Sequence, residues 1–137
     1  MRVLIDTNVI LDYLLEREPF LQDAQALFQA IGSEQVIGYV TATTLTDIFY
    51  IARRQTQSVE QANQVVSMTL AVMEICPVDR AVLEVALTSG IRDFEDAVQV
   101  ACAIAQTLDA IVTRDTQDFY NATVPVLSVS QLLEQLE

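Results

Sequence analysis

The sequence contains no histidine, no lysine and no tryptophan, and its seven basic residues, all arginines, are set against nineteen acidic residues. The lack of histidine excludes a Ser-His-Asp hydrolase and a histidine-based ribonuclease. The lack of lysine excludes a P-loop and the usual form of a phospho-acceptor receiver or haloacid-type phosphatase. Any catalysis must therefore use carboxylates and hydroxyls.

Cysteine is almost as scarce. Cys76 and Cys102 lie far apart in the sequence, so they lack the spacing of a metal-ligand pair, and we expect two buried free thiols in a reducing compartment. The N-terminal residues lack the basic and apolar regions of a signal peptide, and no apolar run approaches the roughly 20 residues of a membrane span. These features predict a soluble, cytoplasmic protein.

Glycine and proline number only three each in 137 residues, of which 52% are hydrophobic. This composition predicts one compact domain over residues 1–137. The predicted strands are Arg2–Ile5, Val36–Val40, Ala110–Thr113 and Val124–Leu127, with a shorter candidate at Met73–Cys76. The predicted helices are Asn8–Leu15, Leu21–Ile31, Thr44–Arg54, Val59–Val72, Arg80–Leu87, Phe94–Thr107 and a last helix capped by Ser128 or Ser130. This alternation indicates an α/β fold, a three-layer α/β/α sandwich with a mostly parallel sheet of four or five strands.

Ligands of such sheets bind beyond the carboxyl ends of the strands, and two acidic residues are expected there in the first part of the chain. Asp6 directly follows the first strand and precedes Thr7 and Asn8, and Asp47 lies one turn into the helix that follows the second strand. Simpler roles are open to both. Asp6 or Thr7 can cap the next helix, and Asp47 can face solvent.

Two more acidic segments lie in the second half of the chain. In RDFEDAVQVACAIA, Asp93 is the expected helix cap, and the favourable helix dipole alone would explain Asp96. The rest of that helix is too apolar for a surface helix, so we expect Asp96 at the rim of a cleft. In AIVTRDTQDF, Thr113 ends a strand and Asp115 and Asp118 follow, although aspartate is also a common turn residue.

Carboxylates that are held close together repel one another unless a cation joins them. A site with oxygen ligands and neither histidine nor cysteine suits a hard divalent ion, Mg²⁺ or Mn²⁺. Such an ion activates a water for attack on a phosphodiester and offsets charge on the leaving oxygen. The acidic segments therefore permit phosphodiester hydrolysis without a histidine.

The segments LIDTNVILDYL, TATTLTDIFY, DFEDAVQVACA and DAIVTRDTQDF, in this order and spacing, resemble the PIN domain, and most closely the VapC-like toxin ribonucleases of bacterial toxin–antitoxin pairs. The resemblance extends from Arg2 to Phe119. It implies a Mg²⁺- or Mn²⁺-dependent endoribonuclease specific for single-stranded RNA. It also implies a homodimer and a small antitoxin that reaches into the acidic cleft.

The resemblance also assigns roles to residues of this sequence. It makes Asp6 and Asp96 metal ligands, with Asn8 as a supporting neighbour, and Thr113 resembles the hydroxyl residue that steadies the acids. Either Asp115 or Asp118 supplies the fourth acid, and this choice stays open.

Two residues complete the predicted site. Asp93 supports it as the helix cap. Asp47 completes the catalytic set, although the family usually has glutamate there. An aspartate side chain ends roughly 1.5 Å nearer the backbone, so a water-mediated contact and a preference for the larger Mn²⁺ are both open.

The formal net charge of −12 opposes RNA binding unless basic residues gather where the RNA lies. Arg53, Arg54, Arg92 and Arg114 flank the acidic segments and are the candidate RNA contacts, although pairing with nearby acids would also explain them. The acidic surplus suits a basic antitoxin.

Two other functions stay open. A PIN-fold protein with inefficient cleavage would serve as an RNA- or protein-binding module. The aspartate at position 47, where the family usually has glutamate, is the reason for considering this function. A small-molecule phosphohydrolase would use the same acids and would turn over p-nitrophenyl phosphate better than RNA.

Overall fold

The computed structural model describes residues 1–137. The strands are β1 (Arg2–Ile5), β2 (Ile37–Thr41), β3 (Glu74–Cys76), β4 (Ala110–Val112) and β5 (Val126–Leu127). The helices are α1 (Thr7–Leu14), α2 (Leu21–Gly32), α3 (Ala42–Thr56), α4 (Val59–Val72), α5 (Arg80–Leu87), α6 (Phe94–Ala105), the short 3₁₀ helix η1 (Thr116–Phe119) and α7 (Val129–Leu136). Every strand and α-helix that the sequence predicts is present, and its ends lie within two residues of the predicted ones.

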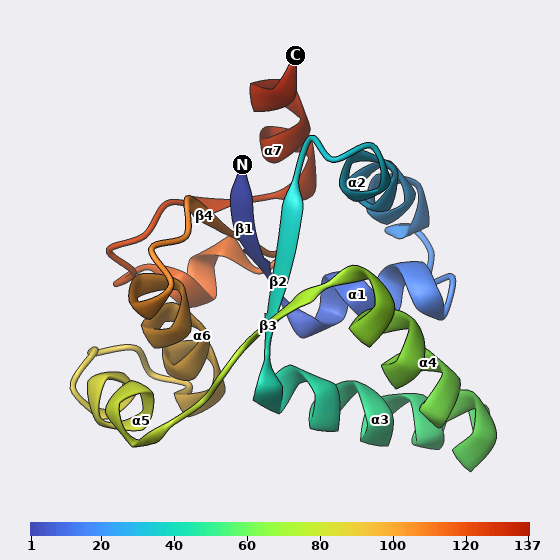
Figure 1. Ribbon diagram of the computed structural model, residues 1–137, viewed down its shortest axis with the longest axis horizontal. Coiled ribbons are helices and arrows are strands. Elements are labelled where there is room, and N and C mark those ends of the chain that lie inside the picture. The colour runs from blue at the N-terminus through green and yellow to red at the C-terminus, as the bar shows by residue number, and fades with distance from the viewer.

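The five strands form one sheet in the order β3-β2-β1-β4-β5, and every pair is parallel (Figure 1). The α/β prediction is confirmed, and the sheet is wholly rather than mostly parallel. From β1 the chain first builds β2 and β3 on one side and later adds β4 and β5 on the other, so the strand order reverses at β1. The carboxyl ends of β1 and β4 therefore flank the crevice in which ligands of such sheets bind.

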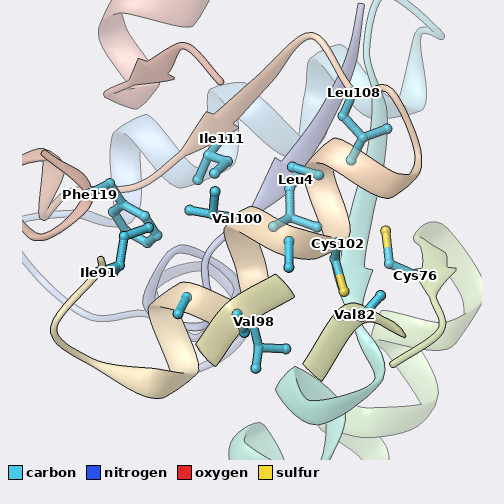
Figure 2. Close-up of a cluster of buried hydrophobic side chains, with 14 residues drawn as sticks. Leu4, Cys76, Val82, Ile91, Val98, Val100, Cys102, Leu108, Ile111 and Phe119 are labelled. Atoms are coloured by element: carbon cyan, nitrogen blue, oxygen red, sulfur yellow. The ribbon is translucent and has the colours of Figure 1, made fainter. Parts of the chain in front are cut away.

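Helices cover both faces of the sheet, because successive strand residues point to opposite sides. Leu4 and Ile111 belong to an apolar cluster under α5 and α6 that also contains both cysteines (Figure 2). Cys76 and Cys102 are buried, as predicted. Burial raises the pKa of Cys76 to about 11 and that of Cys102 to about 12, so neither thiol forms a reactive thiolate near neutral pH.

The other face of the sheet packs against α1, α2 and α7. Val3 and Ile5 of β1 and Leu27 of α2 belong to this second cluster. A third, smaller cluster joins α1 to the α3–α4 hairpin through Leu11, Ile48 and neighbouring side chains. This third cluster fixes α3 beside α1, and with it the helix that carries Asp47 (Figure 1).

Side chains cap most of the helices, as the sequence predicts. Asp6, rather than Thr7, caps α1, and Ser128, rather than Ser130, caps α7 in a capping box with Gln131. The interior of α6 is buried without interruption from Ala97 to Ala103, which confirms that this helix runs through the core. No helix of the structure has the length and apolar character needed to cross a membrane.

Candidate functional site

Asp6 lies at the centre of the candidate site, directly beyond the carboxyl end of β1. Its amide donates to the carbonyl of Val112 at 3.0 Å, which continues the pairing of β1 with β4. Its side chain is 7% exposed. One carboxylate oxygen, Oδ1, accepts from the amide of Thr7 at 2.8 Å, and the other, Oδ2, accepts from the Thr113 hydroxyl at 2.8 Å. The Thr113 hydroxyl thus helps to hold the Asp6 carboxylate in place.

Gln99 also holds Asp6, and sequence reasoning missed it. This side chain of α6 is fully buried, and its amide nitrogen donates to Oδ1 of Asp6 at 3.0 Å. Burial raises the pKa of Asp6, while the hydrogen bonds from Gln99, Thr113 and Thr7 oppose that rise. The sequence signal was the one polar residue among the apolar residues that follow Asp96 in α6, three positions after Asp96 and therefore on the same helix face.

Asp96 lies at the start of α6, where the Asp93 carboxylate accepts from its amide at 3.0 Å. Burial raises the pKa of Asp96 to about 7, and the negative charges of Asp93, Asp6, Asp118 and Asp115 add to the rise. The structure therefore brings these predicted residues close enough to act on one another's charge.

Asp47 approaches this group from α3. The hydroxyl of Thr44, one turn earlier on α3, lies 3.1 Å from that of Thr7 on α1, and this contact ties the two helix starts together. One carboxylate oxygen of Asp47, Oδ2, is buried without a hydrogen-bond partner. An unpaired buried acceptor is unfavourable, and a bound water or a cation beside it would offset that cost.

Glu95 is the neighbour of Asp47 that sequence reasoning missed. Burial raises the pKa of Glu95 to about 8, and the neighbouring negative charges of Asp47, Asp93 and Asp6 add to the rise. Glu95 therefore extends the acidic group from Asp96 towards Asp47 on α3.

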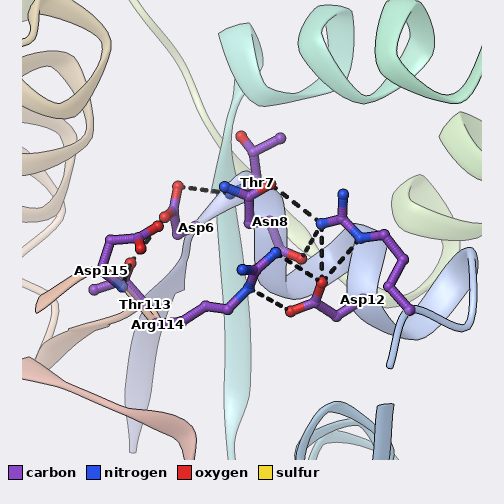
Figure 3. Close-up of polar contacts among 8 residues, drawn as sticks. Asp6, Thr7, Asn8, Asp12, Thr113, Arg114 and Asp115 are labelled. Atoms are coloured by element: carbon purple, nitrogen blue, oxygen red, sulfur yellow. Dashed lines mark hydrogen bonds and ion pairs between the residues drawn. The ribbon is translucent and has the colours of Figure 1, made fainter. Parts of the chain in front are cut away.

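Asp115 and Asp118 face the group from the segment after β4. Asp115 caps η1 by position, yet its side chain forms no cap hydrogen bond, and Figure 3 shows it directed towards Asp6. Asp118 borders a surface hollow of about 560 Å³ that contains Asp96. Both acids raise the pKa of Asp96, so the structure leaves both as candidates for the fourth acid. The hollow is lined by Arg92, Asp93, Asp96, Gln117, Asp118 and Tyr120.

The four candidate arginines have different surroundings. Arg92 is exposed at the rim of the hollow that contains Asp96. Arg53 and Arg54 are exposed at the far end of α3, where they border a second hollow of about 420 Å³ together with Tyr50. Arg114 instead pairs with Asp12 through two hydrogen bonds of 2.8 and 3.1 Å. Of the two roles considered for this arginine, the structure therefore shows pairing with a nearby acid.

Asn8 points away from the acidic group. Its side-chain oxygen accepts from Arg17 at 3.1 Å (Figure 3). This hydrogen bond links the first turn of α1 to Arg17, in the segment that follows α1.

The potential ligands in the acidic group are all carboxylate oxygens, and these are the ligands that a hard divalent ion prefers. No three of its side chains are arranged so that they hold a metal ion directly. Mg²⁺, however, keeps several of its waters and takes only one or two carboxylates from a protein. The unpartnered oxygen of Asp47 and the mutual repulsion of the acids both fit a cation bound partly through water.

Comparison with known proteins supports these observations. A family model described as PIN domain matches residues 2–117. No curated protein matches the sequence. Among solved structures, FitAcB from Neisseria gonorrhoeae is 24% identical, with a TM-score of 0.71 over 93% of this chain and 98% of that chain.

Two further structures are similar. VapBC from Salmonella typhimurium, solved bound to DNA, is 15% identical, with a TM-score of 0.73 over 94% of this chain and 98% of that chain. The sarcin-ricin-loop-cleaving toxin VapC20 from Mycobacterium tuberculosis is 16% identical, with a TM-score of 0.66 over 80% and 86%. Because the family model covers most of the sequence, this protein belongs to the PIN domain family, and its fold is that of the VapC and FitB toxins of toxin–antitoxin complexes.

Proposed function

We propose that this protein is a metal-dependent endoribonuclease that cleaves single-stranded RNA, and that it is the toxin of a toxin–antitoxin pair. One observation carries the proposal. Acidic side chains from four separate segments gather beyond the carboxyl ends of β1 and β4 in a PIN fold. These are Asp6, Asp47, Asp96, Asp115 and Asp118.

Mg²⁺ or Mn²⁺ would be held by Asp6, Asp96 and either Asp115 or Asp118, partly through the waters that such an ion keeps. When bound, such an ion supplies an activated water at neutral pH and offsets charge on the leaving oxygen. Other side chains of the protein position two of these acids. Thr113 and Gln99 fix the Asp6 carboxylate, and Asp93 fixes the first turn of α6, which carries Asp96.

The substrate would approach over the hollow of about 560 Å³ beside Asp96. Arg92 on its rim offers a cation to a phosphate. Tyr120, 69% exposed, offers a ring face on which an unpaired base can stack, and such stacking is tolerant of sequence. A single strand presents both groups to one surface, which favours single-stranded RNA over a duplex.

The partner would be a basic antitoxin. Structures of similar fold include one described as a toxin–antitoxin complex from Klebsiella pneumoniae and several VapBC assemblies. A net charge of −12 favours association with a basic partner by electrostatic complementarity. We also propose a homodimer, which light scattering of the purified protein checks directly.

The test is cleavage of a labelled pool of single-stranded RNA in Mn²⁺, in Mg²⁺ and in EDTA, with Asp96→Asn run in parallel to expose contaminating nuclease. A matched control is Asp23→Asn, the same change at an exposed position of α2. We expect cleavage that needs the metal, falls at least 100-fold in Asp96→Asn and is unchanged in Asp23→Asn.

Two results would redirect the proposal. Faster turnover of p-nitrophenyl phosphate than of any RNA would indicate a phosphohydrolase. Absence of cleavage by a folded wild-type protein would indicate an RNA- or protein-binding module, with Asp47 as the reason.

A further inference from the structure

Asp12 is a buried acid outside the proposed metal-binding set. It lies on α1, six residues after Asp6, and is 2% exposed. A buried carboxylate is costly unless it is paired and hydrogen-bonded. Asp12 is paired twice, with Arg17 and with Arg114, so both of its carboxylate oxygens have a cationic partner.

Arg114 meets Asp12 with two nitrogens. Its Nε donates to Oδ2 at 2.8 Å, and a terminal nitrogen donates to Oδ1 at 3.1 Å (Figure 3). This two-point geometry is the strongest that an arginine forms with a carboxylate. The guanidinium also lies over the ring of Phe20, 3.8 Å from its centroid. Arg114 is therefore fixed on the α1 side of the crevice.

The restraint of Arg114 by Asp12 matters because Arg114 is a neighbour of the acidic group in the sequence. It lies between Thr113, which donates to Asp6, and Asp115, which Figure 3 shows directed towards Asp6. Arg114 also borders a small hollow of about 250 Å³ together with Asp115 and Asp118. A guanidinium released from Asp12 would have these two acids within its reach.

An arginine paired with Asp115 or Asp118 would compete with a metal ion for the same oxygens, since both are cations that bind carboxylate. We propose that Asp12 is a positioning residue that binds Arg114 on α1 and thereby keeps its guanidinium off Asp115 and Asp118. This inference rests on the proposed function, because it assumes that those acids serve a divalent ion.

The test is the affinity for Mn²⁺ alone, measured by isothermal titration calorimetry on the full chain. Asp12→Asn releases Arg114, so we expect Mn²⁺ to bind at least tenfold more weakly than to wild type. The double variant Asp12→Asn/Arg114→Gln removes the competitor, so we expect its affinity to return to within threefold of wild type. If Asp12 had a merely structural role, both variants would bind Mn²⁺ equally weakly.

The outcomes separate this inference from the proposed function. Wild-type affinity in Asp12→Asn, or no recovery in the double variant, would overturn the inference while the metal site stands. Absence of Mn²⁺ binding by the wild type would overturn both.

If Asp12→Asn does not fold, Arg114→Gln still tests the inference, because Asp12 keeps Arg17 as its partner in that variant. We expect Arg114→Gln to bind Mn²⁺ within threefold of wild type. A tenfold loss would show that the site needs the guanidinium itself, and this would contradict the inference.

Discussion

The charge of Asp96 has two opposite effects. It favours the binding of a cation, but it destabilises the folded protein when no cation is bound. The pKa of Asp96 is raised from 3.8 to about 7 by burial and by the neighbouring acids. Between these two pH values the folded protein keeps a proton that the unfolded chain has released, so the free energy of unfolding decreases as the pH rises. Above about pH 7 Asp96 is charged in the folded protein as well, and the full destabilisation by its charge is present.

Removing this charge should therefore stabilise the metal-free protein. We expect Asp96→Asn to melt at a higher temperature than wild type at pH 8 in EDTA, and the two to converge near pH 4. A gain of about 1 kcal/mol corresponds to roughly 4 °C for a domain of this size. Thermal melts of both proteins across this pH range check the expectation, and a lower melting temperature for Asp96→Asn at pH 8 would refute it.

The length of the side chain at position 47 leads to a separate prediction, about metal preference. One buried oxygen of Asp47 has no partner, and the PIN resemblance suggests the longer glutamate at this position. We expect Asp47→Glu to raise the rate of RNA cleavage in Mg²⁺ at least threefold relative to the rate in Mn²⁺, because the longer side chain reaches a smaller ion. Parallel assays in the two metals measure this ratio, and an unchanged ratio would argue against water-mediated contact.

The sequence predicted the acids of the site better than the residues that support them. Asp6, Asp93, Asp96 and Thr113 follow from strand ends and helix caps, which are local features. Gln99 and Asp12 escaped prediction because each is a polar residue inside an apolar helix. Such residues acquire a role only from contacts with distant segments, such as the contact of Asp12 with Arg114.

At the scale of elements, apolar periodicity and capping residues place nearly every helix and strand. The strand order was not predictable, because the short apolar runs do not encode which strands are neighbours. The packing of the α3–α4 hairpin on α1 through Leu11 and Ile48 was likewise not evident, although it decides where Asp47 lies. Local pattern thus determined the elements, and long-range packing determined the site.

The capping box of α7 provides a test at this scale, because α7 lies on the opposite side of the sheet from α6. Ser128 accepts from the amide of Gln131 at 3.2 Å, and the Gln131 side chain accepts from the amide of Ser128 at 2.9 Å. Ser128→Ala should lower the free energy of unfolding by about 1 kcal/mol. Urea unfolding measures this change, and calorimetry should show an unchanged affinity for Mn²⁺. A changed affinity would mean that the site depends on α7.

At the scale of the whole molecule, a net charge of −12 makes any RNA contact depend on a few arginines. Arg54 is exposed on α3, whereas Arg80 is exposed on α5 in a pair with Glu84. Arg54→Gln should weaken RNA binding at low salt and reduce the slope of log affinity against log salt by about one. Fluorescence anisotropy with Arg80→Gln as the control measures both quantities. Equal slopes for the two variants would remove Arg54 from the RNA surface.

We propose that a divalent cation offsets the repulsion among the carboxylates that gather at this site. The most direct test of this claim is the melting temperature at pH 8 as Mn²⁺ is titrated from EDTA upwards, for wild type and Asp96→Asn. Ligand that binds only the folded state stabilises it progressively. We predict a rising curve for wild type and a flat one, starting higher, for Asp96→Asn. A wild-type melting temperature that Mn²⁺ leaves unchanged would contradict the claim.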